Sequence, residues 1–573
     1  MNVSNAGQIS NDPTRNSYDV VVLGSGASGL ATALFCSLRG LRVLVIEESQ
    51  YIGGTSALSG GTTWAPLSKI GRQVNQTDSM ESVTQFLDQI IGNDQKPQRD
   101  HFLQQASQAI EELENKTDVH FRPCPKHPDY VWTNSNATLN GRAIEPIPFS
   151  TRGLGRLREY IRPPIPEFTV LGGMQIDRID ISNLLNRFKS FSSFIYVARL
   201  VMRYAFDTIV FGRHTRVVMG QALIARLLQS CLKNGVEFVT KSSVIELSIE
   251  RHVLRSFVLQ TPSQRKRIET NALVSATGGA GQNPNTRENV YPSTLSPYSP
   301  ANPDNKGSFH DLLKREGVSY GRTSVTPAFY APVSIKHRND GTTAVYPHFV
   351  FDRSKPGTIC VNGEGKRFIN ETISYHDFGK TILDRGDGDK PIWLIGDSSA
   401  VKKYGLGLLR PGGDDPARLI ANGYLKRGET IAELANLIDV HAAVLESTIK
   451  HYNTMAESGV DEDFGRGKTE YQRHNGDQTH QPNPTMRSLV AGPFYAVRLF
   501  IGDIGSSIGF GTTVDGQVIG SNGDPFTNLY AAGGDMLSVM AGHYPGPGIT
   551  IGPGITFGYI VANHIHHAKR TAR

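Results

Sequence analysis

Short apolar runs and one helical run alternate over the first fifty positions. Residues 18–23 read Tyr-Asp-Val-Val-Val-Leu and predict a buried strand, residues 24–29 predict a glycine-rich turn, and residues 30–38 predict a helix. A second apolar run, residues 42–46, predicts another strand that ends at Glu47. Strand, turn, helix, strand and acid in this order are typical of a βαβ unit that binds a dinucleotide.

The turn contains the pattern Gly-x-Gly-x-x-Gly, which is weak evidence alone and strong evidence inside such a unit. The pyrophosphate is expected at the helix N-terminus, where backbone amides and the helix dipole favour an anion. The acid is expected at a ribose hydroxyl. The predicted cofactor contacts are therefore Gly24, Gly26, Ala27, Ser28, Gly29 and Glu47. The dinucleotide could still be NAD or FAD.

The loop after the second strand distinguishes the two cofactors. Residues 53–61 read Gly-Gly-Thr-Ser-Ala-Leu-Ser-Gly-Gly, and such a loop can follow a ribityl chain and a flavin ring. A nicotinamide dehydrogenase would continue here into another βα unit, so the loop favours FAD. The predicted contacts are Gly54, Thr55, Ser56, Ser59, Gly60 and Gly61. Because residues 55–61 contain no histidine for a covalent flavin link, we expect non-covalent FAD.

The rest of the cofactor domain is expected near residues 235–247, at 272–279 and at the C-terminal end. Residues 272–279 taken alone would be an ordinary strand and turn. Residues 542–554 alternate proline with glycine, so this loop is stiff and leaves backbone amides uncovered beside Tyr544. The additional predicted cofactor contacts are Val244, Ala276, Thr277, Gly278, Gly533, Asp535, Gly548 and Thr550.

With both ends of the chain considered, the sequence resembles the 3-ketosteroid dehydrogenases, within the fumarate reductase/succinate dehydrogenase flavoprotein group. The likeness extends from about Tyr18 to about Ile565. Its most specific segments are Tyr-Pro-Gly-Pro-Gly at 544–548 and Thr-Phe-Gly-Tyr at 556–559, and weaker ones are 161–169, 391–395, 459–467 and 492–497.

The resemblance implies an α/β fold in which a Rossmann-like FAD-binding domain is built from two chain segments. We predict that residues 17–290 and 485–573 form this domain, and that residues 291–484 form an inserted α+β substrate-capping domain. The polar stretches 293–305 and 472–483 are expected as the two crossings.

Dehydrogenation beside a ketone requires a base, a group that stabilises the developing enolate, and a hydride acceptor, which is the flavin. The resemblance puts the hydroxyl of Tyr544 and the amide of Gly548 at the ketone oxygen, as an oxyanion hole. It makes Tyr375 the base and Tyr130 its helper, although Val131 follows where the family often has a second tyrosine. A phenol of pKa about 10 is a poor base, so the site must stabilise the phenolate or relay its proton. We leave out His376, because adjacent residues on a strand face opposite ways.

Several alternatives share this fold and cofactor. A fumarate reductase needs cationic clamps, whereas residues 542–554 contain His543 but no arginine or lysine, so an apolar ketone fits better. Desaturation of the C1–C2 bond of a 3-ketosteroid is our interpretation, and 4(5)-dehydrogenation or formation of another enone would use the same machinery. Gly554-Ile555 replaces the Ala-Met pair frequent in the family. Intact Tyr375 and Tyr544 argue against an inactive flavin-binding protein.

Composition adds few constraints. The chain has 573 residues, 38% of them hydrophobic, and a net charge of +6 whose basic residues are dispersed, which argues against nucleic-acid binding. Its four cysteines have no paired or metal-like spacing, so we predict a reduced, cytoplasmic protein without a metal. Residues 1–16 are polar and are expected to be disordered, with no leader segment. The expected partners are a 3-ketosteroid and an electron acceptor such as a quinone.

Residues 182–211 mix large apolar side chains with Lys189, Arg199 and Arg203 at helix-like intervals. The charges prevent the segment from spanning a bilayer. Most such helices pack their apolar side against the rest of the protein. The alternative is a helix that lies on a lipid surface, which would suit an enzyme with a lipid-soluble substrate.

Overall fold

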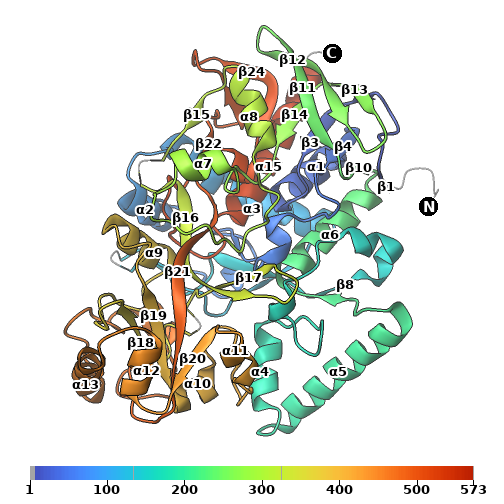
Figure 1. Ribbon diagram of the computed structural model, residues 1–573. Helices are drawn as coiled ribbons and strands as arrows, with labels where there is room; N and C mark the ends of the chain where they lie inside the picture. The colour runs from blue at the N-terminus through green and yellow to red at the C-terminus, as the bar shows by residue number, and fades with distance from the viewer. Residues whose placement is uncertain (1–6, 133–134, 324, 351, 572–573) are drawn as a thin grey trace.

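A seven-stranded sheet forms the centre of the cofactor domain in the computed structural model, which describes residues 7–132, 135–323, 325–350 and 352–571 (Figure 1). The strand order is β1-β10-β4-β3-β14-β24-β23, and all neighbours run parallel except β24 and β23. The strands are β1 Ile9–Ser10, β10 Glu237–Val239, β4 Val43–Ile46, β3 Val20–Leu23, β14 Leu273–Ser275, β24 Pro525–Ala531 and β23 Gln517–Ile519. The first and last parts of the chain therefore meet at β14.

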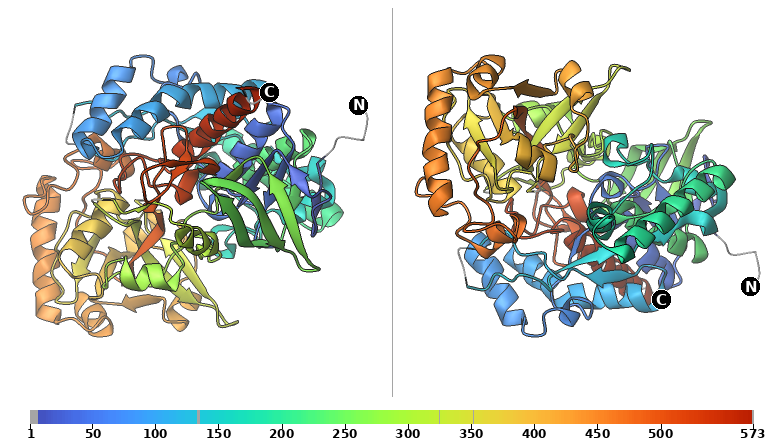
Figure 2. Two further views of the ribbon diagram at one scale, coloured as in Figure 1. Left: turned by 90° about the horizontal axis from the view of Figure 1, so that it is seen from above. Right: turned by 90° about the horizontal axis from the view of Figure 1, so that it is seen from below.

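Helices cover this sheet and bury it, which explains the uninterrupted apolar runs of its strands. Helix α1 (Ala27–Leu38) contacts β3 and β4 and also packs against α6 (Met219–Lys233) and the C-terminal α15 (Ile551–Thr571). Helix α15 also contacts α3 (Lys96–Lys116), so the C-terminal helix lies beside helices from the first 116 residues (Figure 2). The predicted strand–turn–helix–strand unit is confirmed.

A four-stranded sheet lies beside the parallel sheet. Its order is β11-β12-β13-β2, with the first three strands antiparallel. The strands are β11 Ser243–Glu250, β12 Val253–Gln260, β13 Arg265–Thr270 and β2 Ser17–Tyr18. Val244 thus lies in this second sheet, two residues after Ser242, whose N–H donates to the carbonyl of Glu47.

The capping domain is built on a six-stranded antiparallel sheet, as the predicted α+β insertion requires. Its order is β17-β16-β21-β19-β18, and β20 also pairs with β21. The strands are β16 Ala328–His337, β17 Thr343–Pro347, β18 Thr358–Asn362, β19 Ile392–Asp397, β20 Leu425–Gly428 and β21 Phe494–Ser506. Helix α9 (Tyr375–Asp384) packs on β16, and α13 (Ala442–Ser458) lies on the outside of the sheet (Figure 1).

The division into residues 17–290, 291–484 and 485–573 stays a prediction, but its last boundary needs correction. Strand β21 follows residue 484 and nevertheless pairs with β16 and β19 of the capping sheet. A strand cannot be separated from the sheet that satisfies its backbone hydrogen bonds, so the return crossing lies after Ser506. Residues 293–305, the predicted first crossing, contain no helix or strand.

The remaining elements connect the two domains or extend from them. The strands are β5 Thr63–Trp64, β6 Phe121–Pro123, β7 Ala143–Pro146, β8 Phe149–Ser150, β9 Arg216–Val217, β15 Tyr320–Gly321 and β22 Gly509–Phe510. The α-helices are α2 Met80–Ile91, α4 Arg178–Asn186, α5 Phe191–Phe211, α7 Pro284–Asn289, α8 Ser308–Arg315, α10 Ser398–Tyr404, α11 Ala417–Ala421, α12 Ile431–Leu437 and α14 Glu470–Asn475. The 3₁₀ helices are η2 Thr55–Leu58, η3 Gly71–Gln73, η4 Thr151–Tyr160, η5 Pro166–Phe168 and η6 Gly533–Asp535.

The N-terminal segment is more ordered than its composition indicates. Ile9 and Ser10 pair with β10, and Thr14 donates from its N–H and its hydroxyl to Glu237 at 2.6 and 2.8 Å. The prediction of disorder is therefore wrong for residues 7–16, because the edge of the parallel sheet supplies partners that a polar composition does not reveal. Residues 1–6 lie outside the described residues.

The four cysteines are buried and unpaired, as their spacing indicates. Over the described part of the chain, no helix combines the length and the apolar character needed to cross a bilayer. The cytoplasmic location stays a prediction.

One buried carboxylate joins the end of β14 to the end of β24. Asp535 accepts hydrogen bonds from the hydroxyl of Ser275 and from the N–H groups of Thr277 and Gly279, both at 2.7 Å. Nε2 of His310 lies 3.1 Å from it. Burial alone would raise the pKa of Asp535, but His310 and these hydrogen bonds lower it from 3.8 to about 2.

We predict that Asp535→Asn destabilises the protein in a pH-dependent way. A carboxyl group with a depressed pKa stabilises the fold above its unfolded pKa, and that contribution, about 2 kcal/mol here, is lost as the pH falls through the folded pKa. The variant should therefore have a lower denaturation midpoint at neutral pH, and the difference should shrink below about pH 4. An equal difference at all pH values would contradict the assignment.

Candidate active site

The glycine turn after β3 has the geometry that a dinucleotide requires. Gly24 has a φ of +95°, and a Cβ on Gly29 would lie 2.0 Å from the carbonyl oxygen of Gly24, so the turn and the helix are too close for other side chains. Gly26 differs, because its Cβ would meet only Ser56 Oγ, at 3.7 Å. The turn thus leaves its backbone open at the position that approaches a pyrophosphate. The N-cap residue of α1 is Gly26, which has no side chain to occupy this helix N-terminus.

The acid after β4 lies against this turn. Glu47 is buried and accepts hydrogen bonds from the N–H and hydroxyl of Ser25 at 3.0 and 2.5 Å and from the N–H of Ser49 at 2.9 Å. Burial raises its pKa. Glu47 directly follows β4 and so lies at the carboxyl ends of the parallel strands, where such an acid can accept from a ribose hydroxyl.

The predicted flavin loop is held between the turn and residues of the first crossing. Ser56 Oγ accepts from the N–H of Ala27 at 3.1 Å, and Thr55 Oγ1 accepts from the N–H of Asn302 and from Nδ2 of Asn305 at 3.0 and 3.1 Å. Gly54 and Gly26 lie so close that a Cβ on Gly54 would be 3.7 Å from Cα of Gly26. The two glycine loops therefore form one backbone surface.

The C-terminal segments complete this surface. A Cβ on Gly533 or on Gly554 would lie 2.3 or 2.1 Å from Ser28 Oγ, and a Cβ on Gly534 would lie 2.9 Å from the carbonyl of Gly278. The predicted residues around Ser28, Gly278 and Gly533 are thus brought together, in close backbone packing that only glycine permits. A set of glycine backbones, hydroxyls and a helix N-terminus with a glycine N-cap fits FAD, whose pyrophosphate and ribityl chain need close backbone approach. The carboxylate of Asp535, by contrast, is fully engaged by protein donors.

Three tyrosines meet beside this surface. The ring centroids of Tyr375 and Tyr544 are 5.1 Å apart, those of Tyr130 and Tyr375 are 5.4 Å apart, and those of Tyr130 and Tyr544 are 5.8 Å apart. The three residues come from segments more than 150 positions apart along the chain. The structure therefore brings together the predicted base, its helper and the predicted ketone-binding phenol; their catalytic roles stay predictions.

Local hydrogen bonds set the positions of these rings. The N–H of Tyr130 donates to the carbonyl of Pro545 at 2.7 Å, which ties the helper to the loop of Tyr544. Tyr375 is the first residue of α9, and Ser374 caps this helix by accepting from the N–H of Asp377 at 3.1 Å. The assumption that Tyr375 lies on a strand is therefore wrong, because the Ser-x-x-Asp capping pattern starts a helix.

Gly548 packs against β5 with a φ of +85°. A Cβ there would lie 2.4 Å from the carbonyl oxygen of Thr62, so only glycine fits. Its carbonyl accepts from the N–H of Trp64 at 3.1 Å and from the N–H of Gly552 at 2.9 Å. Gly548 is partly exposed and Thr550, directly before α15, is exposed.

The cluster keeps its phenols protonated. Burial raises the pKa of Tyr375 and Tyr130 well above the ordinary value; neighbouring tyrosines raise the pKa of Tyr375 further, whereas for Tyr130 the hydrogen bond with Tyr375 lowers it in part. Burial also raises the pKa of Tyr544, although hydrogen bonding with Tyr375 and Thr550 lowers it in part. The protein alone therefore does not stabilise a phenolate at these positions.

Sequence reasoning missed several residues around the cluster. Phe349 packs on Tyr375 with ring centroids 4.7 Å apart, and Phe329 lies edge-on to Tyr544 at 5.2 Å. Tyr471 lies 5.2 Å from Tyr130, and its hydroxyl has no hydrogen-bond partner among the described residues. His376, excluded by the strand argument, lies 6.0 Å from the ring of Tyr544. The serine and aspartate of the capping pattern were the signal that could have placed His376 on a helix.

One group of potential metal ligands lies outside the cluster. Side-chain atoms of Cys124, His127 and Glu145 lie within 4.8 Å of one another. Glu145, however, pairs with Arg122 at 3.3 Å and Arg178 at 3.0 Å, and these cations compete with a metal ion. We assign no metal to this group.

Comparisons with known proteins show the family of this chain. A family model described as an FAD binding domain matches residues 19–551. A 4-oxocyclohex-2-ene-1-carboxylate 5-dehydrogenase from Sinomonas cyclohexanicum is 34% identical over 94% of this chain and 92% of its own. A 3-oxosteroid 1-dehydrogenase from Mycolicibacterium smegmatis is 31% identical over 98% of this chain and 99% of its own.

Among solved structures, the 3-ketosteroid delta1-dehydrogenase from Sterolibacterium denitrificans, in complex with 1,4-androstadiene-3,17-dione, is 29% identical. It superimposes with a TM-score of 0.88 over 97% of this chain and 100% of that chain. The match covers both domains. The chain therefore belongs to the FAD binding domain family and is an FAD-dependent oxidoreductase.

Proposed function

We propose that this enzyme desaturates the C1–C2 bond of ring A in 3-ketosteroids, taking a proton from C2 and a hydride from C1. The observation that carries the proposal is the meeting of Tyr130, Tyr375 and Tyr544 in a buried, aromatic site. The similarity to 3-oxosteroid 1-dehydrogenases over nearly the whole chain supports the choice of substrate. The 4(5)-dehydrogenation of the same steroids remains the alternative, since it needs the same groups.

Each protein group has a defined task in this reaction. The bound FAD supplies the hydride acceptor, at its N5 atom. The hydroxyl of Tyr544 and the amide of Gly548 donate to the ketone oxygen and stabilise the enolate, which makes the C2 proton more acidic. Tyr375 takes that proton while its own hydroxyl proton passes to Tyr130, which in turn releases its hydroxyl proton toward solvent, so neither phenol has to exist as a free phenolate.

The surrounding charges favour a ketone over a dicarboxylate. Burial lowers the pKa of His376 to about 3 and also lowers the pKa of His543, so both rings are neutral at physiological pH. Neutral histidines cannot clamp two carboxylates in the way that fumarate reduction requires. The aromatic rings of Phe329 and Phe349 line the same site and suit an apolar ring system.

A second candidate substrate is a small cyclic ketone that carries one carboxylate. The observation in its favour is the 34% identity to a 4-oxocyclohex-2-ene-1-carboxylate 5-dehydrogenase. Such a substrate presents the same ketone to Tyr544 and Gly548, but its carboxylate needs a cation or a cluster of donors. The neutral phenols and histidines around Tyr544 favour the uncharged steroid.

We also infer that the FAD is bound non-covalently, because residues 55–61 contain no histidine. We infer that a quinone or a similar acceptor reoxidises it.

The first test is anaerobic reduction of the enzyme-bound flavin. Addition of a 3-keto-4-ene steroid is expected to bleach the visible flavin band and to give the 1,4-diene, because C1 and C2 lie beside the activated ketone. Product analysis distinguishes this outcome from 4(5)-dehydrogenation, for which a saturated 3-ketosteroid is the substrate. Bleaching only by 4-oxocyclohex-2-ene-1-carboxylate, or only by succinate, would overturn the proposal.

The second test is removal of single hydroxyl groups. Tyr544→Phe and Tyr375→Phe are each expected to lower kcat by about 100-fold or more, because each removes one hydrogen-bonding or proton-accepting group. Bound FAD, measured from the flavin absorbance, should be retained. Tyr471→Phe is the matched control, since this buried hydroxyl beside Tyr130 makes no hydrogen bond among the described residues. Full activity in Tyr375→Phe or Tyr544→Phe would show that its role is misassigned.

The third test is the pH dependence of kcat. The proposed relay releases one proton from the tyrosine pair, which becomes easier as the pH rises, and burial holds the pKa of Tyr375 above the ordinary value of about 10. The rate of the proton-transfer step should therefore rise with pH through the neutral and alkaline range. No inflection is expected at about pH 6.5, the ordinary pKa of histidine, because burial lowers the pKa of His376 to about 3. A rise of kcat centred at about pH 6.5 would assign the base to a histidine instead.

A further inference from the structure

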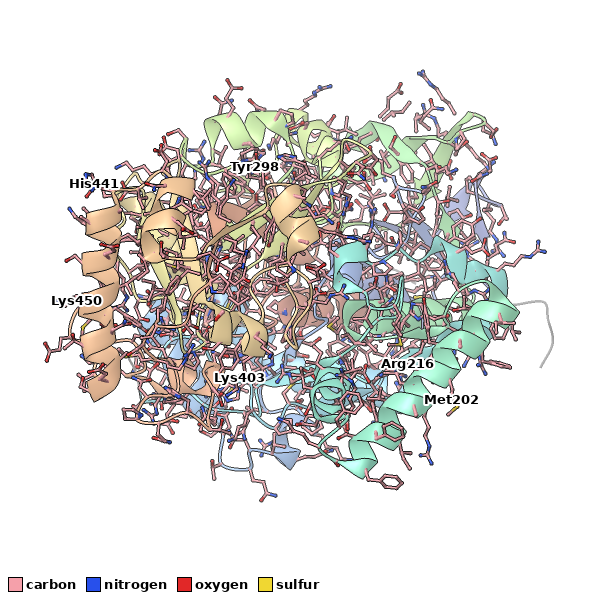
Figure 3. All side chains as sticks on the ribbon, turned by 60° about the horizontal axis from the view of Figure 1, so that its bottom comes forward. Met202, Arg216, Tyr298, Lys403, His441 and Lys450 are labelled. Atoms are coloured by element: carbon pink, nitrogen blue, oxygen red, sulfur yellow. The ribbon has the colours of Figure 1, made fainter. Side chains whose placement is uncertain are left out.

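Helices α4 and α5 form a hairpin that extends along the outside of the molecule (Figures 1 and 2). Its outer surface is apolar. Phe188 is 82% exposed, Phe191 78% and Ile209 84%, so the rest of the protein covers only a small part of these large apolar side chains. Figure 3 shows Met202 pointing away from α5 into the surroundings of the protein. The other exposed large apolar residues here are Leu171, Ile179, Ile181, Leu185, Phe194, Met202, Phe206 and Val210.

The apolar residues of α5 follow one helical stripe. Phe191, Phe194, Met202, Phe206 and Ile209 recur at three- and four-residue steps or their multiples, so they share one face of the helix. In an ordinary surface helix this face would be turned toward the core. Here it is turned away from the protein, and a contiguous exposed apolar surface of this kind marks an interaction site.

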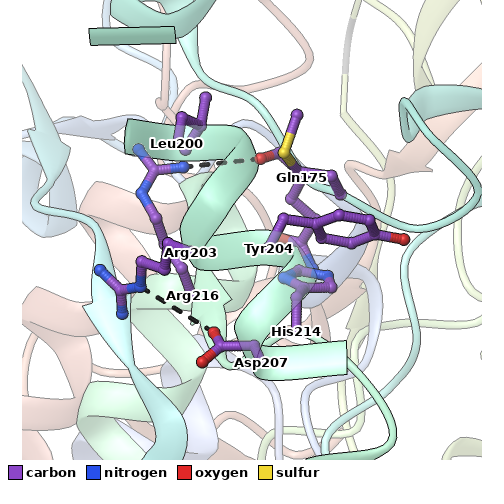
Figure 4. A pocket seen from close by; sticks show the side chains of 8 residues that line it. Gln175, Leu200, Arg203, Tyr204, Asp207, His214 and Arg216 are labelled. Carbon is purple, nitrogen blue, oxygen red and sulfur yellow. Dashed lines mark hydrogen bonds and ion pairs between the residues drawn. The ribbon is translucent and has the colours of Figure 1, made fainter. Parts of the chain in front are cut away.

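The inner face of α5 is correspondingly polar. Its buried residues are Ser193, Leu200 and Asp207, which recur every seven positions. Asp207 accepts from the N–H and hydroxyl of Thr215 at 2.9 and 2.7 Å and pairs with Arg152 at 2.6 Å. Figure 4 shows this inner side, where Arg203 faces Asp207 and Arg216 reaches Gln175. The expectation that the apolar side packs on the protein is therefore wrong.

A second tie fixes the hairpin in this orientation. Asp180 in α4 is buried, accepts from the hydroxyl of Tyr196 in α5 at 2.6 Å, and pairs with Arg216 at 2.9 Å. Buried, partnered carboxylates of this kind are expensive to expose. The hairpin is thus held with its polar side inward, and its apolar stripe is fixed toward the outside.

The charges at the outer surface are of one sign. From residue 178 to residue 213, all of which the structure describes, the acidic side chains are Asp180 and Asp207, and both are fully buried. Arg187, Lys189 and Arg199 are exposed and form no ion pair with the described residues. The surface therefore offers apolar side chains flanked by unpaired cations.

We propose that the outer surface of the α4–α5 hairpin docks on a lipid bilayer that contains anionic phospholipids. Apolar side chains enter the boundary between headgroups and acyl chains, while the flanking cations meet the negative headgroups. A second copy of this chain is a poorer occupant, because a symmetric interface would bring the same cations face to face. Docking does not depend on the reaction that the enzyme catalyses, so it can be measured without turnover.

The test is flotation of the full-length, FAD-loaded protein with lipid vesicles. Vesicles of phosphatidylcholine with a minority of phosphatidylglycerol are expected to carry the protein, and pure phosphatidylcholine vesicles to carry less. The triple variant Arg187→Gln/Lys189→Gln/Arg199→Gln should lower the affinity for the mixed vesicles by about 100-fold, since each surface cation contributes about tenfold or less. The variant Phe188→Ser/Phe191→Ser/Ile209→Ser should abolish flotation.

The capping domain offers a matched control. Leu437, Val460 and Val490 are 50%, 54% and 70% exposed, so their replacement by serine removes comparable apolar surface without touching the hairpin. This control should float like the wild type. Retained flavin absorbance and an unchanged denaturation midpoint would show that each variant is folded.

Three outcomes would overturn the proposal. The first is that the wild type fails to float with the mixed vesicles. The second is that the hairpin variants float as well as the wild type. The third is that the control variant loses as much flotation as the hairpin variants do. A concentration-dependent dimer that the serine variant of the hairpin abolishes, without any vesicle binding, would assign this surface to a second copy instead.

Discussion

The buried carboxylate of Asp535 joins the two parts of the chain that build the cofactor domain. Its hydrogen bonds from Ser275, Thr277 and Gly279 fix the end of β14 against the end of β24. These two ends bring Gly278 and Gly533 to the first turn of α1, and the loop that carries Tyr544 begins a few residues later. The placement of Gly278 and Gly533 and the position of the loop that carries Tyr544 therefore both depend on one charged group whose hydrogen bonds are satisfied inside the protein.

Burial sets the chemistry of the neighbouring site. The capping domain contributes Tyr375 and Phe329, the cofactor domain contributes Tyr544, and the rings of these residues contact one another in the interior of the protein. A site with neutral phenols and neutral histidines binds a ketone at low cost and a dicarboxylate at high cost. The same burial makes a free phenolate unfavourable, so the proposed reaction depends on contact between Tyr375 and Tyr130 and not on one strongly acidic phenol.

The sequence predicted the local conformation of each segment better than the contacts between segments that are far apart along the chain. The glycine turn, the strands around it and the acid at Glu47 could be predicted because each depends on neighbours along the chain. The tyrosine roles came from resemblance, since no local rule brings Tyr130 beside Tyr375. Periodicity identified the apolar stripe between residues 191 and 209 but could not say which side faces the protein, which is decided by distant Arg152 and Thr215. For the same reason, the membership of β21 in the capping sheet could not be predicted.

The most direct measurement of the central claim is a crystal structure of the FAD-loaded protein with a 3-ketosteroid product bound. The account predicts that the hydroxyl of Tyr544 and the amide of Gly548 both lie within hydrogen-bond distance of the C3 oxygen, with the hydroxyl of Tyr375 nearest to C2. A ketone oxygen bound elsewhere, or an arginine or lysine side chain in that position, would contradict it.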